Sequence, residues 1–252
     1  MGNLDTYSSF FYEKQLLESR ESANQVLPII NNWFKPKTII DVGCGVGAWL
    51  EIWKNFENVT EIKGIDGSFI DVSLLRINKE KEFIQTDLNK TLPKIKSYDL
   101  ALCLEVAEHL DEERAETFVA DLVSLSNVII FSAAIPGQEG THHINEQYLG
   151  YWIDKFEAND YKCYDIIRPL IWGKKNISWW FRQNMVVFIK NGELLKNDLN
   201  KLQTFNCMDL VQKELLEHKI NKYRSLVNRK SSFKNLLREM LNKIKKKIYE
   251  KR

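Results

Sequence analysis

The chain has 252 residues, of which 44% are hydrophobic, so it can bury one sizeable core and is typical of a soluble protein. Its four cysteines lie far apart and form no C-x-x-C pair, which argues against a disulfide framework and against a zinc cluster. The formal net charge of +2 conceals a net charge of +11 over residues 219–252 and −9 over the rest.

Apolar runs predict a sheet made of buried strands. They occupy residues 38–42, 61–65, 83–86, 98–104, 127–132 and 183–190, and most are separated by stretches with helical spacing. This alternation predicts an α/β, Rossmann-like fold: a mostly parallel seven-stranded sheet with helices on both faces. Residues 162–168 and 183–190 are too close for a long crossover helix between them, so the last strand should run antiparallel.

Helical segments flank the predicted sheet on both sides. Residues 1–35 contain a helical stretch from 7 to 34, broken before Pro28, that serves as a lead-in or a lid. Residues 36–190 form the main domain. Residues 191–252 have no glycine or proline after Gly192 and predict a helical extension.

A glycine-rich turn follows the first predicted strand. Asp41, Gly43, Gly45 and Gly47 stand at alternate positions before a helix expected from Ala48 to Phe56. Glycines let the backbone approach a ligand closely, and a helix N-terminus adds unpaired N–H groups. The turn also satisfies the dinucleotide pattern G-x-G-x-x-G/A. The extra Gly47 and the acidic Asp41 favour S-adenosylmethionine, whose amino acid part carries positive charge.

Two further carboxylates end the next two strands. Asp66 follows Gly43 by 23 residues, the place from which a carboxylate accepts both ribose hydroxyls. Asp87 ends the third strand, where an acceptor can meet the adenine amino group. Either aspartate alone could be a helix cap, but three acidic strand ends in a row favour a nucleoside site.

Together these residues resemble class I S-adenosylmethionine-dependent methyltransferases, over about residues 36–190. More specific stretches resemble a bacterial subfamily often found with genes for cell-surface polysaccharides: LEVAEHL (104–110), FSAAIPGQEGTHHINEQ (131–147), YW (151–152), RPLIW (168–172) and WWFRQN (179–184). The resemblance implies that the cofactor is bound by Asp41, Gly43, Gly45, Gly47, Asp66 and Asp87. We add Gly67, Leu88 and Leu104, which lie at the same strand ends.

The ends of the fourth and fifth strands are expected to carry the reaction, because methyl transfer to a hydroxyl needs an in-line acceptor and a base. Glu105, Glu108 and His109 are spaced i, i+3 and i+4, so they share a face if this turn is helical. The subfamily pattern G-T-x-H-x-N-E-Q favours His143 over His142. We predict His143, His109 and Glu105 as catalytic residues.

Whether this site holds a metal ion stays open. Glu105, Glu108, His109 and a later histidine also resemble the divalent-metal site of small-RNA 2′-O-methyltransferases and, in part, that of ubiquinone-pathway O-methyltransferases. A metal-free base is the favoured alternative. Four residues are predicted to contact the acceptor, since aromatic rings stack on sugars and arginine binds phosphate: Gln138, Asn145, Trp172 and Arg182.

The basic tail predicts an amphipathic helix over residues 219–252. It suits an anionic membrane surface, and a docking or dimerising helix is an equal alternative. Nucleic acid is disfavoured, because the Asn/Asp-Pro-Pro-aromatic motif of DNA amino-methyltransferases is absent after the fourth strand.

The sequence therefore predicts a cytoplasmic O-methyltransferase, working at the inner face of the membrane if the tail binds lipid. It would methylate a capsule or lipopolysaccharide glycan precursor, at a sugar hydroxyl or at a phosphate- or phosphoramidate-type oxygen, and release S-adenosylhomocysteine. The acceptor would be a glycan or nucleotide-linked molecule. The alternatives are a methyltransferase of another small molecule, a non-catalytic cofactor-binding assembly subunit and a dinucleotide-dependent oxidoreductase.

Overall fold

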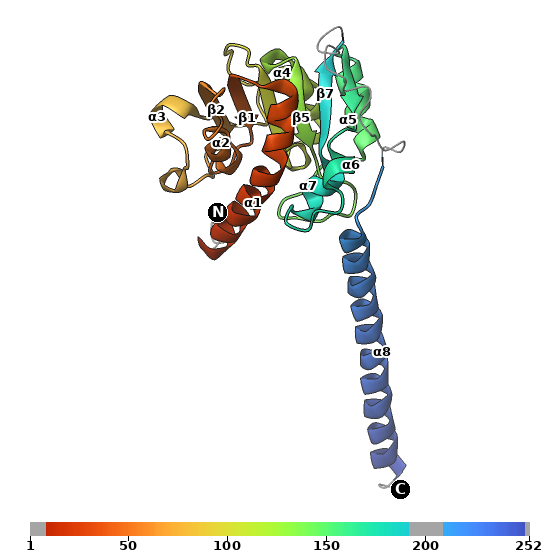
Figure 1. Cartoon of the computed structure of the whole chain (residues 1–252). Helices are drawn as coiled ribbons and strands as arrows, with labels where there is room; N and C mark the ends of the chain where they lie inside the picture. The colour runs from red at the N-terminus through yellow and green to blue at the C-terminus, as the bar shows by residue number, and fades with distance from the viewer. Residues whose placement is uncertain (1–8, 192–208, 250–252) are drawn as a thin grey trace. The chain divides into compact units, whose positions relative to one another are not determined.

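A seven-stranded sheet forms the centre of the protein (Figure 1). The computed structural model describes residues 9–191 and 209–249. The strand order is β3-β2-β1-β4-β5-β7-β6, in which β1 to β5 pair in parallel and β7 runs antiparallel to β5 and β6. The predicted Rossmann-like sheet with a reversed last strand is confirmed. The strands are β1 (Thr38–Val42), β2 (Glu61–Asp66), β3 (Phe83–Gln85), β4 (Leu100–Leu104), β5 (Val128–Ser132), β6 (Tyr161–Tyr164) and β7 (Val186–Lys190).

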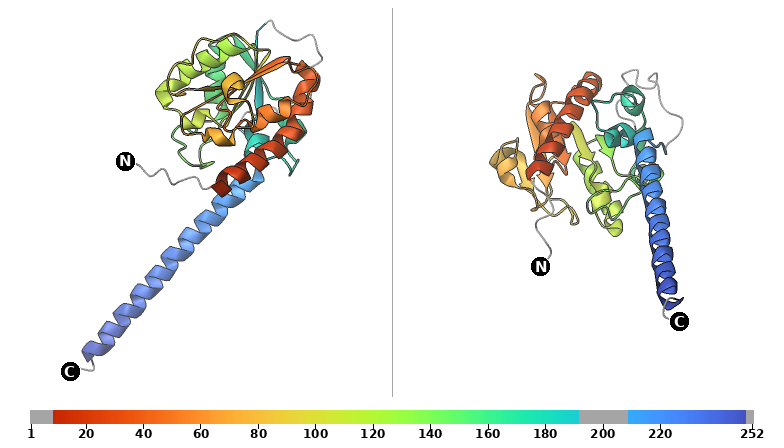
Figure 2. Two further views of the ribbon diagram at one scale, coloured as in Figure 1. Left: turned by 90° about the vertical axis from the view of Figure 1, so that its left-hand side faces the viewer. Right: turned by 90° about the horizontal axis from the view of Figure 1, so that it is seen from below.

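Helices cover both faces of the sheet (Figures 1 and 2). Successive strand residues point to opposite faces, so Ile39 packs in one core layer and Ile40 in the other. The first layer is covered by α1 (Ser9–Phe34), α2 (Ala48–Trp53), α6 (Arg168–Ile171) and α7 (Trp179–Asn184), and the second by α4 (Ala115–Leu125) and α5 (Leu149–Glu157). Shorter elements are α3 (Lys79–Glu82) and the 3₁₀ turns η1 (Val72–Leu74), η2 (Ala107–His109) and η3 (Glu112–Arg114).

Four expected boundaries were wrong. The strand expected over residues 162–168 is β6 (Tyr161–Tyr164), and Arg168 already begins α6. Helix α1 continues through Pro28, because Val26, Leu27 and Ile30 are fully buried on either side of it and this packing outweighs the lost backbone hydrogen bond. Helix α2 ends at Trp53 rather than Phe56. Residues 183–185 do not begin the last strand, since Gln183 and Asn184 end α7 with their polar side chains buried.

The basic tail forms one long helix, α8 (Lys213–Tyr249). The chain divides into two compact units, Met1–Leu210 and Val211–Arg252. Of the predicted helical extension, residues 192–208 lie outside the described residues, and 209–212 are not helical. Within residues 9–191 and 209–249, none of the helices has the length and apolar composition needed to span a bilayer.

Candidate active site

The glycine turn lies at the carboxyl end of β1 and needs its glycines. Gly43, Gly45 and Gly47 have φ values of +80°, +55° and +85°, in the left-handed region that favours glycine. A Cβ on Gly43 would lie 2.2 Å from Cγ2 of Val106. The backbone N–H of Gly43 donates to the Ile65 carbonyl across 2.7 Å, which ties the turn to β2.

Asp66, the last residue of β2, is fixed against the same turn. Its Oδ2 accepts from the backbone N–H of Gly45 and its Oδ1 from that of Gly67, both at 2.6 Å. The side chain is buried. Burial raises the pKa of Asp66 to about 6, although both N–H groups oppose this shift. The carboxylate is therefore held in place at the strand end where ribose binding was predicted.

Asp41 lies fully buried beside Asp66. Burial raises the pKa of Asp41 to about 8, and the charge of Asp66 adds to the shift. Two neighbouring carboxylates that are costly to ionise form a site that favours a positively charged ligand, because such a ligand offsets both burial and repulsion.

The remaining predicted cofactor residues lie at the same edge of the sheet. Asp87 is exposed and accepts from the backbone N–H of Asn89 across 3.0 Å, a local turn contact. Leu88 and Leu104 are buried. The sequence analysis did not single out Phe69, whose side chain is 71% exposed. A Cβ built on Gly67 would lie 2.3 Å from the Phe69 ring, so the ring packs directly against Gly67. An aromatic residue three positions after Asp66 was the signal available in the sequence, since such rings stack on bases.

Glu105 has hydrogen-bond partners of its own after β4. Its φ of +55° breaks the helical geometry, so Glu105 does not share a helix face with Glu108 and His109, contrary to expectation. Its carboxylate accepts from Gln138 Nε2 at 2.7 Å and from Asn184 Nδ2 at 3.1 Å. Burial raises its pKa, and these amides oppose the shift. Glu105 thus belongs to a buried amide network.

Glu108, His109 and His143 form a separate cluster. One ligand-type atom from each lies within 4.8 Å of the others, and the two imidazole rings meet edge to face with centroids 4.8 Å apart. The Glu108 carbonyl accepts from the backbone N–H groups of Ile144 at 2.9 Å and Asn145 at 3.0 Å. These bonds hold the loop after β5 against the turn after β4.

The carboxylate of Glu108 is fully buried, and within the described residues neither oxygen has a hydrogen-bond partner. The backbone N–H groups of Glu108 and Ala134 face it without reaching hydrogen-bond geometry. Burial, with the nearby charge of Glu105, raises its pKa well above the usual range. An unpaired buried carboxylate is costly, so Glu108 is a candidate to bind a ligand.

The two imidazoles are oriented by their Nδ1 atoms. His109 Nδ1 lies 3.3 Å from the carbonyl of His142, and His143 Nδ1 lies 2.9 Å from Glu146 Oε1. His109 reaches solvent, yet partial burial and then the neighbouring His143 lower its pKa to about 4, so it is neutral at pH 7. One carboxylate and two imidazoles suit a divalent metal such as Mn²⁺ or Zn²⁺. The unpaired Glu108 oxygens fit such an ion.

The predicted acceptor contacts have different surroundings. Gln138 is buried in the Glu105 network, and Asn145 is buried with its Nδ2 unpaired within the described residues. Trp172 is half-buried. Arg182 is buried, and its guanidinium donates to the carbonyls of Ile177 and Trp172, which fixes the loop before α7.

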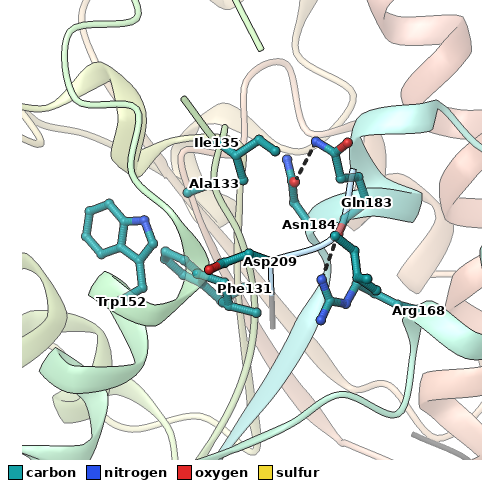
Figure 3. Close-up of a pocket in the computed structure, with 10 residues that line it drawn as sticks. Phe131, Ala133, Ile135, Trp152, Arg168, Gln183, Asn184 and Asp209 are labelled. Carbon is teal, nitrogen blue, oxygen red and sulfur yellow. Dashed lines mark hydrogen bonds between the residues drawn. The ribbon is translucent and has the colours of Figure 1, made fainter. Parts of the chain in front are cut away.

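A small cavity lies next to the amide network (Figure 3). Gln183 Nε2 donates to Asn184 Oδ1 at 3.1 Å, and Arg168 donates to the Gln183 carbonyl at 3.2 Å. The cavity has a volume of about 10 Å³, which is room for about one water molecule. It is too small for an acceptor. Its lining also includes Phe131, Ala133, Ile135, Leu149, Trp152, Asp209 and Leu210.

Known proteins resemble this chain in sequence and in fold. Residues 18–118 match a family model described as a methyltransferase domain. A mitochondrial ubiquinone biosynthesis O-methyltransferase of Candida albicans is 32% identical over 81 residues, which cover 29% of this chain and 25% of that relative. The chain therefore matches a quarter of the length of this curated relative.

Solved structures share the fold. DesVI of Streptomyces venezuelae aligns with a TM-score of 0.53 and 12% identity, covering 72% of this chain and 95% of its own. The plantazolicin methyltransferase BpumL, solved with a triazolic desmethylPZN analog and SAH, aligns with a TM-score of 0.50 and 22% identity, covering 73% and 89%. The sheet order, the glycine turn and the match of residues 18–118 together support a class I methyltransferase domain.

Proposed function

We propose that this protein is an S-adenosylmethionine-dependent O-methyltransferase. The observation that carries the proposal is the placement of two sites at one edge of the sheet. The buried Asp41–Asp66 pair lies at the ends of β1 and β2, and the Glu108–His109–His143 cluster follows the adjacent strands β4 and β5. A donor in the first site would thus present its methyl group toward the second.

The first site suits S-adenosylmethionine on charge and shape. Asp41 and Asp66 favour a ligand with positive charge, which the sulfonium and ammonium groups provide. In this proposal Asp66 would bind the ribose, and the exposed Phe69 and Asp87 would flank the adenine. A dinucleotide would instead bring its pyrophosphate charge close to Asp41, which is unfavourable.

In the proposed reaction, an acceptor oxygen attacks the methyl carbon in line with the sulfonium. The carbon–sulfur bond breaks, its electron pair stays on sulfur as S-adenosylhomocysteine, and the acceptor proton passes to a base. Among the described residues we assign this task to His143; the contact of its Nδ1 with Glu146 supports the assignment, because it leaves Nε2 for the proton.

A metal-assisted form of the same reaction is the second candidate, favoured by the unpaired carboxylate of Glu108. Glu108, His109 and His143 would hold the ion, which would lower the pKa of a coordinated acceptor hydroxyl. Glu105 would stay outside this set because Gln138 and Asn184 already occupy its oxygens.

We further propose that the acceptor is a cell-surface glycan precursor. The sequence resemblance in residues 131–184 supports this, as do the partly exposed Trp172, Trp179 and Trp180 beside exposed Lys174 and Lys175. Rings stack on sugars, and lysines attract phosphate. The alternative of another small molecule is supported by the names of the ubiquinone and plantazolicin enzymes.

Mass spectrometry of surface glycans from cells with and without this protein tests the acceptor. We expect a loss of 14 daltons, one methylene equivalent, from a glycan component in cells that lack it. Unchanged glycans together with turnover on small phenols or peptides would replace the glycan by a small molecule. Binding of S-adenosylmethionine without turnover on any acceptor would favour a non-catalytic subunit.

We also propose that α8 brings the protein to the inner face of the membrane. Leu216, Ile220, Tyr223 and Val227 are exposed on this helix at spacings of four, three and four residues. Exposed Lys222 and Arg224 lie among them, within the segment of net charge +11. An apolar stripe among cationic residues is complementary to an anionic lipid surface.

A further inference from the structure

Glu146 makes an unusually complete set of contacts for a side chain in a loop. Its Oε2 accepts from the backbone N–H of Gly137 at 2.7 Å. Its Oε1 accepts from the backbone N–H of Glu139 at 2.7 Å and faces Nδ1 of His143 at 2.9 Å. One carboxylate therefore fixes both the turn after β5 and the imidazole that follows it.

These contacts determine which nitrogen of a neutral His143 carries the proton. An ionised carboxylate can only accept hydrogen bonds, and backbone N–H groups can only donate them. Nδ1 of His143 must therefore be the donor to Glu146. Nε2 is left with its lone pair, as a base or as a metal ligand requires.

The His143 ring is confined from a second direction by Gly140. A Cβ built on Gly140 would lie 2.2 Å from Nε2 of His143, so the ring occupies the space that any other residue would fill. The same loop has Gly137 at φ +86°, Glu139 at +61° and His142 at +60°. A turn with so many left-handed residues needs strong contacts to persist, and Glu146 provides them.

We propose that Glu146 is a positioning residue: it sets the tautomer and the orientation of His143 in the proposed methyl transfer. The expected effect of Glu146 on the reaction rate rests on the proposed function. The tautomer itself follows from the contacts. Glu146 acts through His143, in the way that a carboxylate orients a catalytic or metal-binding imidazole in other enzymes.

The decisive variant is Glu146→Gln, which keeps the size of the side chain. Its amide can accept from Nδ1–H or donate to Nδ1, so the variant no longer restricts His143 to the Nδ1–H tautomer. Two-bond ¹⁵N–¹H correlation spectra read the tautomer directly, and with four histidines in the chain His143 is assigned by comparison with His143→Ala. We expect the Nδ1–H form in the wild type and a shift toward Nε2–H in the variant.

The kinetic arm uses the same protein. Glu146→Gln should lower kcat about 10- to 100-fold with little change in the Kd of S-adenosylmethionine, because the donor site is untouched. Glu57→Gln, which removes the same charge from an exposed site in the loop before β2, should leave kcat unchanged. Gly140→Ala should displace the His143 ring and lower kcat while Glu146 remains.

Two results would overturn the inference. One is a wild-type His143 with its proton on Nε2, and the other is a Glu146→Gln protein that keeps the wild-type tautomer and kcat. Wild-type protein that shows the expected tautomer but no methyl transfer to any acceptor would count against the proposed function, not against the placement of His143 by Glu146. If Glu146→Gln fails to fold, the wild-type spectrum still tests the tautomer of His143, and Gly140→Ala still tests whether the position of its ring affects kcat.

Discussion

The Oδ2 atom of Asp66 lies 2.6 Å from the backbone nitrogen of Gly45, so the carboxylate that ends β2 is hydrogen-bonded to the glycine turn that ends β1. This bond joins two strand ends before any ligand binds. Asp41 lies buried beside them, and burial, with the added charge of Asp66, raises its pKa.

Affinity for S-adenosylmethionine should rise with pH between about 6 and 8. The pKa of Asp41 in the free protein is about 8, so at pH 6 this carboxyl is protonated, and a cationic ligand must displace the proton. Isothermal titration in buffers of different ionisation enthalpy should show tighter binding at pH 8 and proton release at pH 6 to 7. Asp41→Asn should bind weakly at every pH, and a wild-type affinity that is flat from pH 6 to 9 would contradict this role.

The same substitution should stabilise the free protein. A carboxyl whose folded pKa lies above its unfolded value destabilises the fold as pH rises from about 4 toward 8. Asp41→Asn should therefore raise the Tm of cofactor-free protein at pH 8 and leave it nearly unchanged at pH 4. Thermal unfolding followed by circular dichroism at the two pH values makes the comparison. A lower Tm at pH 8 in the variant would show that Asp41 holds the turn together.

Gly43→Ala should damage the donor site. The added Cβ would lie 2.2 Å from Cγ2 of Val106, and residue 43 has a left-handed backbone that alanine disfavours. We therefore expect a loss of stability of about 2 to 4 kcal/mol and weaker cofactor binding. Gly150→Ala is the matched control, because within α5 its Cβ has open space. It should raise stability by about 0.5 to 1 kcal/mol. Equal effects of the two substitutions in urea unfolding would refute this account of Gly43.

Glu108→Gln separates the metal-assisted reaction from the metal-free one. With a metal site, Mn²⁺ should raise the Tm of the wild type, and the variant should lose both this shift and turnover. Chelation by EDTA should stop wild-type turnover, and Mn²⁺ should restore it. Turnover that survives EDTA would leave His143 as a base without metal. Differential scanning fluorimetry and a methyl-transfer assay give the two readouts.

Helix α8 should bind anionic vesicles and not neutral ones. Sedimentation with phosphatidylglycerol vesicles should deplete the full chain from the supernatant, and 0.5 M salt should reverse this because charge drives the contact. The double substitution Lys222→Glu and Arg224→Glu should lower partitioning by about tenfold or more for each residue. Salt-resistant self-association by light scattering, without vesicle binding, would favour a dimerising helix.

Apolar runs were sufficient to predict the sheet, because parallel strands covered on both faces are almost continuously hydrophobic, as in Leu100–Leu104. The glycine turn was predictable because glycines at alternate positions after a strand favour left-handed backbone, which Gly43, Gly45 and Gly47 adopt. The break predicted at Pro28 was wrong because the burial of the apolar residues on both sides of it outweighs the tendency of proline to end a helix. The left-handed Glu105 could not be foreseen, since φ depends on Ser132 and on amides 33 and 79 residues away.

Strand β7 runs antiparallel to β5, so the residues just before β7 lie at the sheet edge where β5 ends. Asn184, which precedes β7, therefore reaches Glu105 at that edge. In the proposed function, all the predicted donor residues except Leu104 lie before residue 90, and the predicted acceptor contacts lie after residue 104. The proposed function therefore assigns methyl donor binding and acceptor specificity largely to separate stretches of the chain. Evolution, or an engineer exchanging residues 165–184 between relatives, could change what is methylated while the methyl source stays the same.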